Sequence, residues 1–466
     1  MGKKTVWIVW MLGVLLLSVY YSFRLFASDD QEAFLIGPAT HGHHQIELAC
    51  GSCHTSPFGG GEVLQSACVD CHGDELRAAD DSHPKAKFTD PRNADRLQQL
   101  DARQCVTCHR EHQLEQTGTM GVTLPQDYCF LCHQDIAQDR PSHQGMAFDT
   151  CASAGCHNYH DNQALYEDFL IKSAGEPALK TIAAVAQRSG PALKHPHHVL
   201  GKALAAADAD GSATGDSILT DWLGSAHARA GVNCSGCHAA SPAATEPQTA
   251  PIPWTDSPTI ATCQGCHAAE TDTFYQGKHG MRLAPGLSRT LPPMTPAQGR
   301  LTFNPDAAHR ELTCASCHAP HSVDLRQAAV ESCLNCHADE HSRAFKESPH
   351  FKLWQAEQAG TAAPGSGVSC ATCHLPRETH APNGTQRVLV NHNQNANLRP
   401  NEKMIRSVCQ NCHGLAFAID ALADPQLIQT NFASAPARHI ESIDMALRRD
   451  GDSAAAETET PNHAQP

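Results

Sequence analysis

Cysteine and histidine recur in this chain in a fixed order that could support one kind of covalent chemistry. Ten times the order is Cys-x-x-Cys-His, and once it is the wider run from Cys151 through Cys156 to His157. The eleven pairs use all 22 cysteines, so no thiol remains for a disulfide, a cluster or a catalytic nucleophile. The pairs are Cys50 with Cys53, Cys68 with Cys71, Cys105 with Cys108, Cys129 with Cys132, Cys151 with Cys156, Cys234 with Cys237, Cys263 with Cys266, Cys314 with Cys317, Cys333 with Cys336, Cys370 with Cys373 and Cys409 with Cys412.

This order is the signature of c-type haem attachment. Two thiols three residues apart lie on one side of a helical turn, where both can form thioethers with the vinyl groups of one porphyrin. The next imidazole can then reach the iron. We therefore expect eleven covalent haem c groups, with the proximal ligands His54, His72, His109, His133, His157, His238, His267, His318, His337, His374 and His413.

Other uses of paired cysteines explain less of the pattern. Structural zinc sites share the Cys-x-x-Cys spacing, but they do not require a histidine after each second cysteine. Disulfide frameworks belong to much shorter secreted chains, and cysteine runs of the ferredoxin type are absent. Haem attachment alone accounts for every cysteine.

The supply of histidine favours a second histidine on each iron. Of 31 histidines, 20 are not proximal, whereas methionine never recurs at a fixed distance from a motif. We expect mostly six-coordinate haems of low potential, because methionine ligation would raise the potential. The distal candidates are His41, His44, His83, His112, His143, His160, His227, His279, His309, His321, His341, His350, His380 and His392.

Three motifs carry a further histidine three residues after the proximal one, and these are His112 after His109, His160 after His157 and His321 after His318. Both side chains of such a pair point the same way from the backbone, so the second cannot close the far face of the same haem. It can reach the iron of a neighbouring haem, which predicts a compact haem stack.

Composition predicts a mainly α fold with much irregular structure. Only 5% of residues are aromatic, and the 32 Gly and 29 Pro fit loops that cover cofactors, so we expect a core packed around porphyrins. The net charge of -15 excludes nucleic acid as a partner, because phosphate binding needs a basic face.

Residues 1–28 are expected to form one N-terminal transmembrane anchor. The run from Thr5 to Phe23 carries no charge and is long enough to form a membrane-spanning helix. Lys3 and Lys4 place the N-terminus in the cytoplasm, so the haem domains would lie in the periplasm of a bacterium, outside its cytoplasmic (inner) membrane. A cleaved signal peptide is the alternative, but no Ala-x-Ala site follows.

The motifs divide the rest of the chain. Residues 29–165 hold five motifs, and residues 225–420 hold six. Residues 166–224, without cysteine, are read as a linker that is partly helical at 181–187 and 200–209. Histidines within 194–198 could ligate iron or form a polar turn. Residues 421–466 form a C-terminal segment, and we expect disorder from Asp450 onward.

Two family resemblances follow from these patterns. Residues 29–165 resemble the class III multihaem cytochromes c in motif density, in histidine placement and in the wide fifth motif. Residues 225–420 resemble the haem-rich part of the hydroxylamine oxidoreductase and octahaem nitrite reductase superfamily. No Cys-x-x-Cys-Lys site is present, and Tyr275 is not assigned to the cross-linking role of the oxidoreductase tyrosine.

Three functions remain open. The first is electron transfer along the haems between a membrane donor, such as a quinol or a quinol-oxidising complex, and redox protein partners. The second is an enzyme acting on a small nitrogen or sulfur compound, such as nitrite, hydroxylamine or sulfite, at one open haem of residues 225–420. The third is a subunit of a haem filament, which a retained anchor would count against.

Overall fold

The computed structural model describes most of the chain. The described residues are 2–26, 32–56, 59–140, 143–145, 157–161, 165–181, 185, 206–209, 215–239, 254–380, 387–398 and 403–458. Of the expected helices at 181–187 and 200–209, the structure describes only residues 181, 185 and 206–209, and these are not helical. The histidines at 194–198 lie outside the described ranges. Cys151 and Cys156, the cysteines of the fifth motif, also lie outside the described residues.

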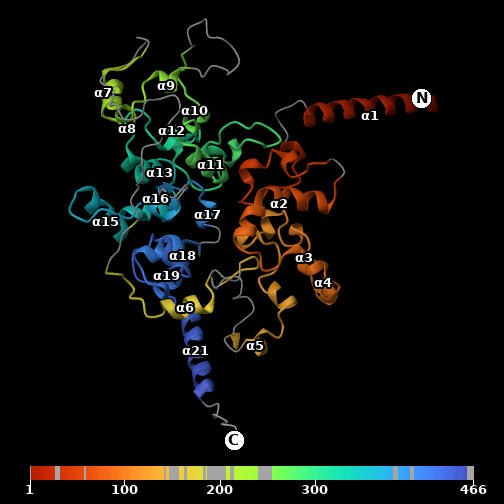
Figure 1. The fold of residues 1–466 in the computed structure, drawn as a ribbon. Coiled ribbons are helices and arrows are strands. Elements are labelled where there is room, and N and C mark those ends of the chain that lie inside the picture. The colour runs from red at the N-terminus through yellow and green to blue at the C-terminus, as the bar shows by residue number, and fades with distance from the viewer. Residues whose placement is uncertain are drawn as a thin grey trace. The chain divides into compact units, whose positions relative to one another are not determined.

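The described chain is mainly helical, with many short helices joined by irregular segments (Figure 1). This agrees with the expected fold class. The helices are α1 (Lys3–Phe26), α2 (Gly61–Ala78), α3 (Lys85–Thr89), α4 (Ala94–Gln99), α5 (Ile136–Asp139), α6 (Glu167–Ser173), α7 (Asp216–Gly224), α8 (Ala226–Ala230), α9 (Ser235–His238), α10 (Ile260–Gln264), α11 (Ala268–Gln276), α12 (Cys314–Cys317), α13 (Ser332–Leu334), α14 (Glu340–Ala344), α15 (Pro349–Gln358), α16 (Cys370–His374), α17 (Asn395–Leu398), α18 (Met404–Ser407), α19 (Leu415–Leu422), α20 (Pro425–Gln429) and α21 (Ser442–Thr458).

One two-stranded antiparallel sheet occurs in the described chain. It pairs β1 (Arg377–His380) with β2 (Arg387–Val390), in a register that sets Arg377 opposite Val390 and His380 opposite Arg387. The hairpin directly follows the motif of Cys370 and Cys373, and β2 leads into His392.

Several short helices are fixed by capping side chains. Asp339, Ser348 and Asp424 accept hydrogen bonds from first-turn backbone N–H groups of α14, α15 and α20. Pro349 and Pro425 occupy the first turn of α15 and α20, where a missing N–H has no cost. Local sequence therefore sets these helix starts.

The chain divides into two compact units. Unit 1 is Met1–Cys132 with the loop Gly286–Thr290, and unit 2 is His133–Pro285 with Leu291–Pro466. The division falls inside the fourth motif rather than in the linker expected at 166–224. The extent of the two haem modules therefore stays a prediction.

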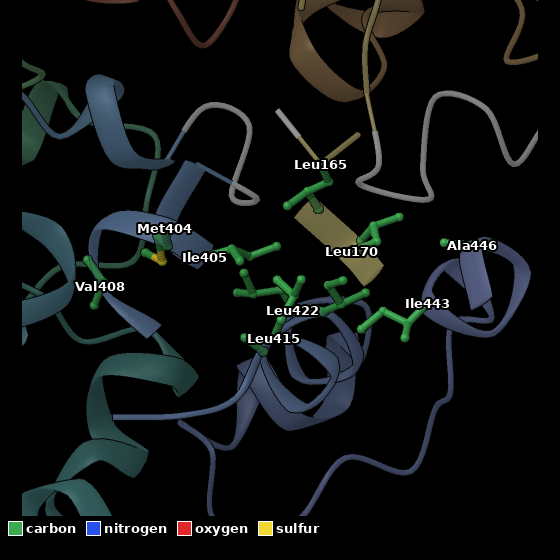
Figure 2. Packing of buried hydrophobic residues seen from close by; sticks show 11 residues of the cluster. Leu165, Leu170, Met404, Ile405, Val408, Leu415, Leu422, Ile443 and Ala446 are labelled. Atoms are coloured by element: carbon green, nitrogen blue, oxygen red, sulfur yellow. The ribbon is translucent and has the colours of Figure 1, made fainter. Parts of the chain in front are cut away.

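Unit 2 contains a hydrophobic core that the sequence did not lead us to expect. Leu165 and Leu170 of the α6 region pack with residues of α18, α19 and α21, among them Leu415 and Ile443 (Figure 2). Cys373 and Cys409 pack against the same cluster. Part of the core is thus ordinary side-chain packing, and two motif cysteines lie at its edge.

The C-terminal segment also differs from expectation. Helix α21 continues to Thr458, through the first half of the tail that we expected to be disordered. The helix begins inside the core, where Ile443 and Ala446 are buried one turn apart. Residues 459–466 lie outside the described ranges.

Helix α1 is long and apolar enough to cross a membrane from Lys3 to Leu25, and its side chains are exposed. A signal sequence near an N-terminus passes the same test of length and composition. The helix could therefore be a single span or a signal peptide.

Candidate haem sites

Most described motifs fold as one turn of helix. In seven of them, the histidine N–H donates a hydrogen bond of 2.8 to 3.0 Å to the carbonyl oxygen of the first cysteine, four residues earlier. The motif of Cys68 to His72 lies in the middle of α2, and that of Cys370 to His374 forms α16. This turn presents both thiols and the imidazole as haem attachment requires.

The attachment cysteines differ in their exposure. Cys53 and Cys71 of unit 1 are exposed, whereas the other described motif cysteines are partly buried. Cys71 is exposed because it lies beside the exposed His72 on the outer side of α2. A haem attached at these two cysteines would have an edge at the surface, and the expected packing of the core around porphyrins stays a prediction.

The wide fifth motif is placed only through its histidine. Cys151 and Cys156 lie outside the described residues, so their expected haem attachment stays a prediction from the sequence. His157 is described, and it takes part in one of the histidine pairs reported next.

The rings of proximal histidines lie opposite histidine rings from other segments of the chain. Eight such pairs occur in the described chain, and each contains one motif histidine. The distances between ring centres are 5.8 Å for His43–His72, 6.3 Å for His143–His157, 6.3 Å for His227–His267, 6.0 Å for His238–His321, 6.2 Å for His279–His337, 6.3 Å for His318–His392, 6.1 Å for His341–His374 and 6.2 Å for His350–His413.

These distances fit two imidazoles on opposite sides of one metal ion. Imidazole–metal bonds are about 2 Å long, and a ring centre lies about 1.1 Å behind its nitrogen in a ring with bonds of about 1.33 Å. The ring centres would then be about 6.2 Å apart. An iron atom bound between the two imidazoles would account for this gap.

The hydrogen bonds of the rings select the tautomer that binds iron. Nδ1 of His238 faces Thr255 O at 2.7 Å, Nδ1 of His392 faces Val390 O at 3.0 Å, and Nδ1 of His413 faces Ala178 O at 2.9 Å. An acceptor at Nδ1 requires the proton there, which leaves Nε2 free for a metal. The same arrangement holds for His109, His227 and His341.

At His279, a buried side-chain atom without a hydrogen-bond partner also indicates a proton on Nδ1. Gln394 Nε2 lies 3.3 Å from His279 Nδ1, and Gln394 Oε1 is buried without a hydrogen-bond partner. Amide nitrogen and oxygen are interchangeable at this level of detail. Turning the amide lets Oε1 accept from a protonated Nδ1, which again directs Nε2 of His279 toward His337.

Burial keeps several of these imidazoles neutral. Burial, and after it the charge of nearby histidines, lowers the pKa of His279, His350 and His374 to about 4. Neutral imidazole is the form that binds a metal.

Asn431 contacts His341 at two atoms. Its Nδ2 lies 3.2 Å from Nε2 of His341 and 3.0 Å from the carbonyl oxygen of His341. Iron bound at Nε2 would displace the first contact and leave the second.

The structure brings half of the distal candidates opposite a proximal histidine. The residues placed in this way are His143, His227, His279, His321, His341, His350 and His392. The histidine that follows His318 by three residues, His321, lies opposite His238 of a different motif. This is the crossing that the His-x-x-His spacing predicted.

The other candidates lie elsewhere. His44 Nδ1 is 3.0 Å from a Glu47 carboxylate oxygen, and His83 stacks on Phe88. His41 and His309 are exposed. His112 hydrogen-bonds Gly37 O, and His160 packs on Tyr159. The side chain of His380 lies outside the described part of the chain.

Sequence reasoning missed His43. It chose His41 and His44 from the run His41-Gly-His43-His44, whereas the ring opposite His72 is that of His43. No local signal separates the three. The choice is made by Glu111, far along the chain, which contacts His43 Nδ1 at 2.7 Å.

Consecutive motifs lie next to one another within each unit. The Cys314 thiol is hydrogen-bonded to the Cys263 thiol, and this bond raises the pKa of Cys314. The Cys333 thiol is hydrogen-bonded to the Cys370 thiol, with the same effect on the pKa of Cys333. In unit 1 the pKa of Cys68 is raised by its bond to Cys105. In a loaded protein these sulfurs would be thioethers, so neighbouring haem groups would lie close together.

Comparison with known proteins agrees with this chemistry for part of the chain. Residues 42–134 match the family model of cytochrome c3. This region is therefore cytochrome c3-like, and it supports a multihaem electron-transfer cytochrome with covalently bound haem c. No curated protein matches the chain. The expected class III character is confirmed for these residues, and the resemblance of 225–420 to the oxidoreductase superfamily stays a prediction.

Proposed function

We propose that this chain is an eleven-haem c-type cytochrome that carries electrons along a series of haems, most of which have two histidine ligands. The observation that carries the proposal is the set of eight histidine pairs, whose ring centres are 5.8 to 6.3 Å apart. Two residues on opposite sides of a metal explain this spacing, and each pair includes the histidine of an attachment motif.

The chain's own residues would hold and isolate each haem. The cysteine pairs would attach it, the paired histidines would ligate its iron, and carbonyl acceptors at Nδ1 would fix the imidazoles. When bound, haem supplies reversible one-electron reduction. Two protein ligands leave no position for a substrate, which suits electron transfer rather than catalysis.

The neighbouring motifs support a series rather than isolated centres. In unit 2, Ser332 next to one motif donates a 2.7 Å hydrogen bond to Cys317 O of the preceding motif. Burial is the main cause of the raised pKa of Cys373, and the charges of the nearby Cys409 and Cys412 are the next causes. Electrons could pass from one site to the next within each unit.

We further propose that α1 anchors the protein in the cytoplasmic membrane of a bacterium, with both units in the periplasm. The support is the length and exposed apolar surface of α1. The donor would be a membrane quinol or a quinol-oxidising complex, and the acceptor a redox protein.

A substrate-reducing enzyme is the second candidate, because it would need one open iron. All six proximal histidines of residues 225–420 lie opposite a second histidine. The pairs found within the described ranges do not include His54, His109 or His133, so these three sites are the places to look for nitrite, hydroxylamine or sulfite binding. A haem filament, the third candidate, would require release of α1.

Intact-mass measurement of the purified protein tests the proposal. We expect the mass of the full chain with eleven haems, including residues 1–26. A protein without haem that carries zinc would contradict the proposal. A mass that corresponds to a chain beginning after α1 would leave the proposed haem attachment intact and contradict the proposed membrane anchor.

A further inference from the structure

The pair of His43 and His72 in unit 1 is held by a carboxylate. Glu111 Oε1 lies 2.7 Å from His43 Nδ1. The other contacts of this carboxylate come from Thr40, whose N–H donates to Oε2 at 2.7 Å and whose hydroxyl donates to Oε1 at 2.8 Å. Thr40 is buried, so the carboxylate is fixed in place rather than mobile at the surface.

The backbone around Glu111 is also fixed. His112 has a left-handed φ of 62° and its Nδ1 contacts Gly37 O at 2.8 Å. A Cβ at Gly37 would lie 2.5 Å from the His112 carbonyl oxygen, so only glycine allows the two segments to approach this closely. The segment from Gly37 to His43 therefore docks on Glu111 and His112.

The opposite ligand of the same site faces a second carboxylate. His72 Nδ1 lies 3.3 Å from Glu75 Oε2, and both side chains are about half exposed, at 51% and 54%. The Glu111 contact is shorter and less exposed, at 31% for the carboxylate. Both axial imidazoles of one site thus have an acidic group at Nδ1.

Other sites use neutral acceptors. Among distal histidines whose Nδ1 partner is described, His227, His341 and His392 face backbone carbonyls, and His279 faces the Gln394 amide. At the proximal His267 the nearest Glu270 oxygen is 4.0 Å away, beyond hydrogen-bond distance. The His43–His72 site stands apart from these in its charge.

We propose that Glu111 is a positioning residue that selects His43 as the distal ligand and lowers the reduction potential of the haem at Cys68 and Cys71. This inference rests on the proposed haem ligation. A carboxylate at Nδ1 raises the basicity of the imidazole and favours ferric over ferrous iron. The haem of this site is therefore the lowest in potential among the sites whose Nδ1 partners are described.

The test is a redox titration of the full haem-loaded protein, followed by its visible spectrum, for the wild type and Glu111→Gln. Glutamine keeps the size of the side chain and removes its charge. We expect the lowest-potential component, equal to one haem, to shift to higher potential. Haem number by intact mass and the bis-histidine spectrum should stay as in the wild type.

Two further variants give the expected gradation. Glu75→Gln should shift the same component upward by less, because its contact is longer and more exposed. Glu270→Gln is the matched control, since Glu270 also lies three residues after a proximal histidine but is too far for a hydrogen bond to that ring. It should leave the lowest component unchanged.

An unchanged lowest component in a fully loaded Glu111→Gln protein overturns the inference and leaves the proposed function intact. If that variant does not load haem, Glu111→Asp, which keeps the charge on a shorter side chain, decides. It should show a smaller upward shift, and no shift would overturn the inference. A wild type without bis-histidine haem would instead defeat the proposed function.

Discussion

The planes of the paired imidazoles distinguish one site from the rest. The ring planes of His238 and His321 are nearly parallel, at 10°, whereas those of the other seven pairs are inclined by 43° to 74°. Trp254 stacks on the His238 ring, with ring centres 5.0 Å apart and planes inclined by 7°. Hydrogen bonds of 2.7 Å also join His238 and Thr255 in both directions.

This geometry predicts a distinct electron paramagnetic resonance signal. Parallel axial planes split the iron d orbitals and give a rhombic low-spin spectrum, and strongly inclined planes give a near-axial one with a larger low-field g value. We expect one rhombic haem in the oxidised protein. Trp254→Leu should free the His238 ring and move that signal toward larger g.

The control for this variant is Phe417→Leu. Phe417 also stacks on a proximal histidine, His413, at 4.7 Å and 17°, but that site has a 66° inclination to His350. Phe417→Leu should leave the rhombic signal unchanged. A wild-type spectrum without any rhombic component would contradict the proposed pairing of His238 with His321.

The sequence predicted proximal histidines from local spacing, because a motif is one helical turn and needs no distant partner. Distal positions depend on long-range folding. His392 lies opposite His318 because the β1–β2 hairpin returns the chain to it. His43 rather than His44 faces His72 because Glu111 holds it, and a single sequence carries no sign of that contact.

At the scale of elements, the sequence underestimated the C-terminal helices. The polar composition after Asp450 predicted disorder, but α21 starts earlier, where Ile443 and Ala446 pack into the hydrophobic core. Arg449 of α21 also forms an ion pair with Glu167 of α6. Apolar residues one turn apart just before the polar tail were the signal that could have revealed this helix.

A histidine outside the haem sites joins two of these helices. His439 Nδ1 lies 3.1 Å from Asp420 of α19, and Nε2 lies 2.7 Å from Asp444 of α21. The hydrogen bond with Asp420, and then that with Asp444, raise the pKa of His439 above its usual 6.5. Both ring nitrogens donate only when the ring is protonated.

The docking of α21 should therefore weaken with rising pH. Because the folded-state pKa is raised, the stabilisation is complete below the unfolded pKa of about 6.5 and is lost as pH rises through the folded value. Exposed ion pairs contribute at most about 1 kcal/mol, so a change of a few degrees in melting temperature is expected. Thermal unfolding between pH 6 and pH 8.5 measures it.

The matched variant is His439→Gln, which retains hydrogen bonding without a titratable charge. Its melting temperature should change less over this pH range than that of the wild type. An equal pH dependence in both proteins would show that His439 does not join α19 to α21 through its charge.

At the scale of the whole molecule, the central claim is that opposed histidines bind iron in pairs. The number of attachment motifs could be read from the sequence, but the number of irons with two histidine ligands could not. The described chain contains eight pairs at the spacing of a shared metal, and the sites of His54, His109 and His133 are not among them.

Near-infrared magnetic circular dichroism of the oxidised protein, scaled to the haem number from intact mass, tests this claim most directly. The charge-transfer band separates bis-histidine iron from histidine–methionine and high-spin iron. We expect at least eight bis-histidine haems in each chain. Fewer than eight, or a high-spin haem that turns over nitrite, hydroxylamine or sulfite, would contradict the electron-transfer account.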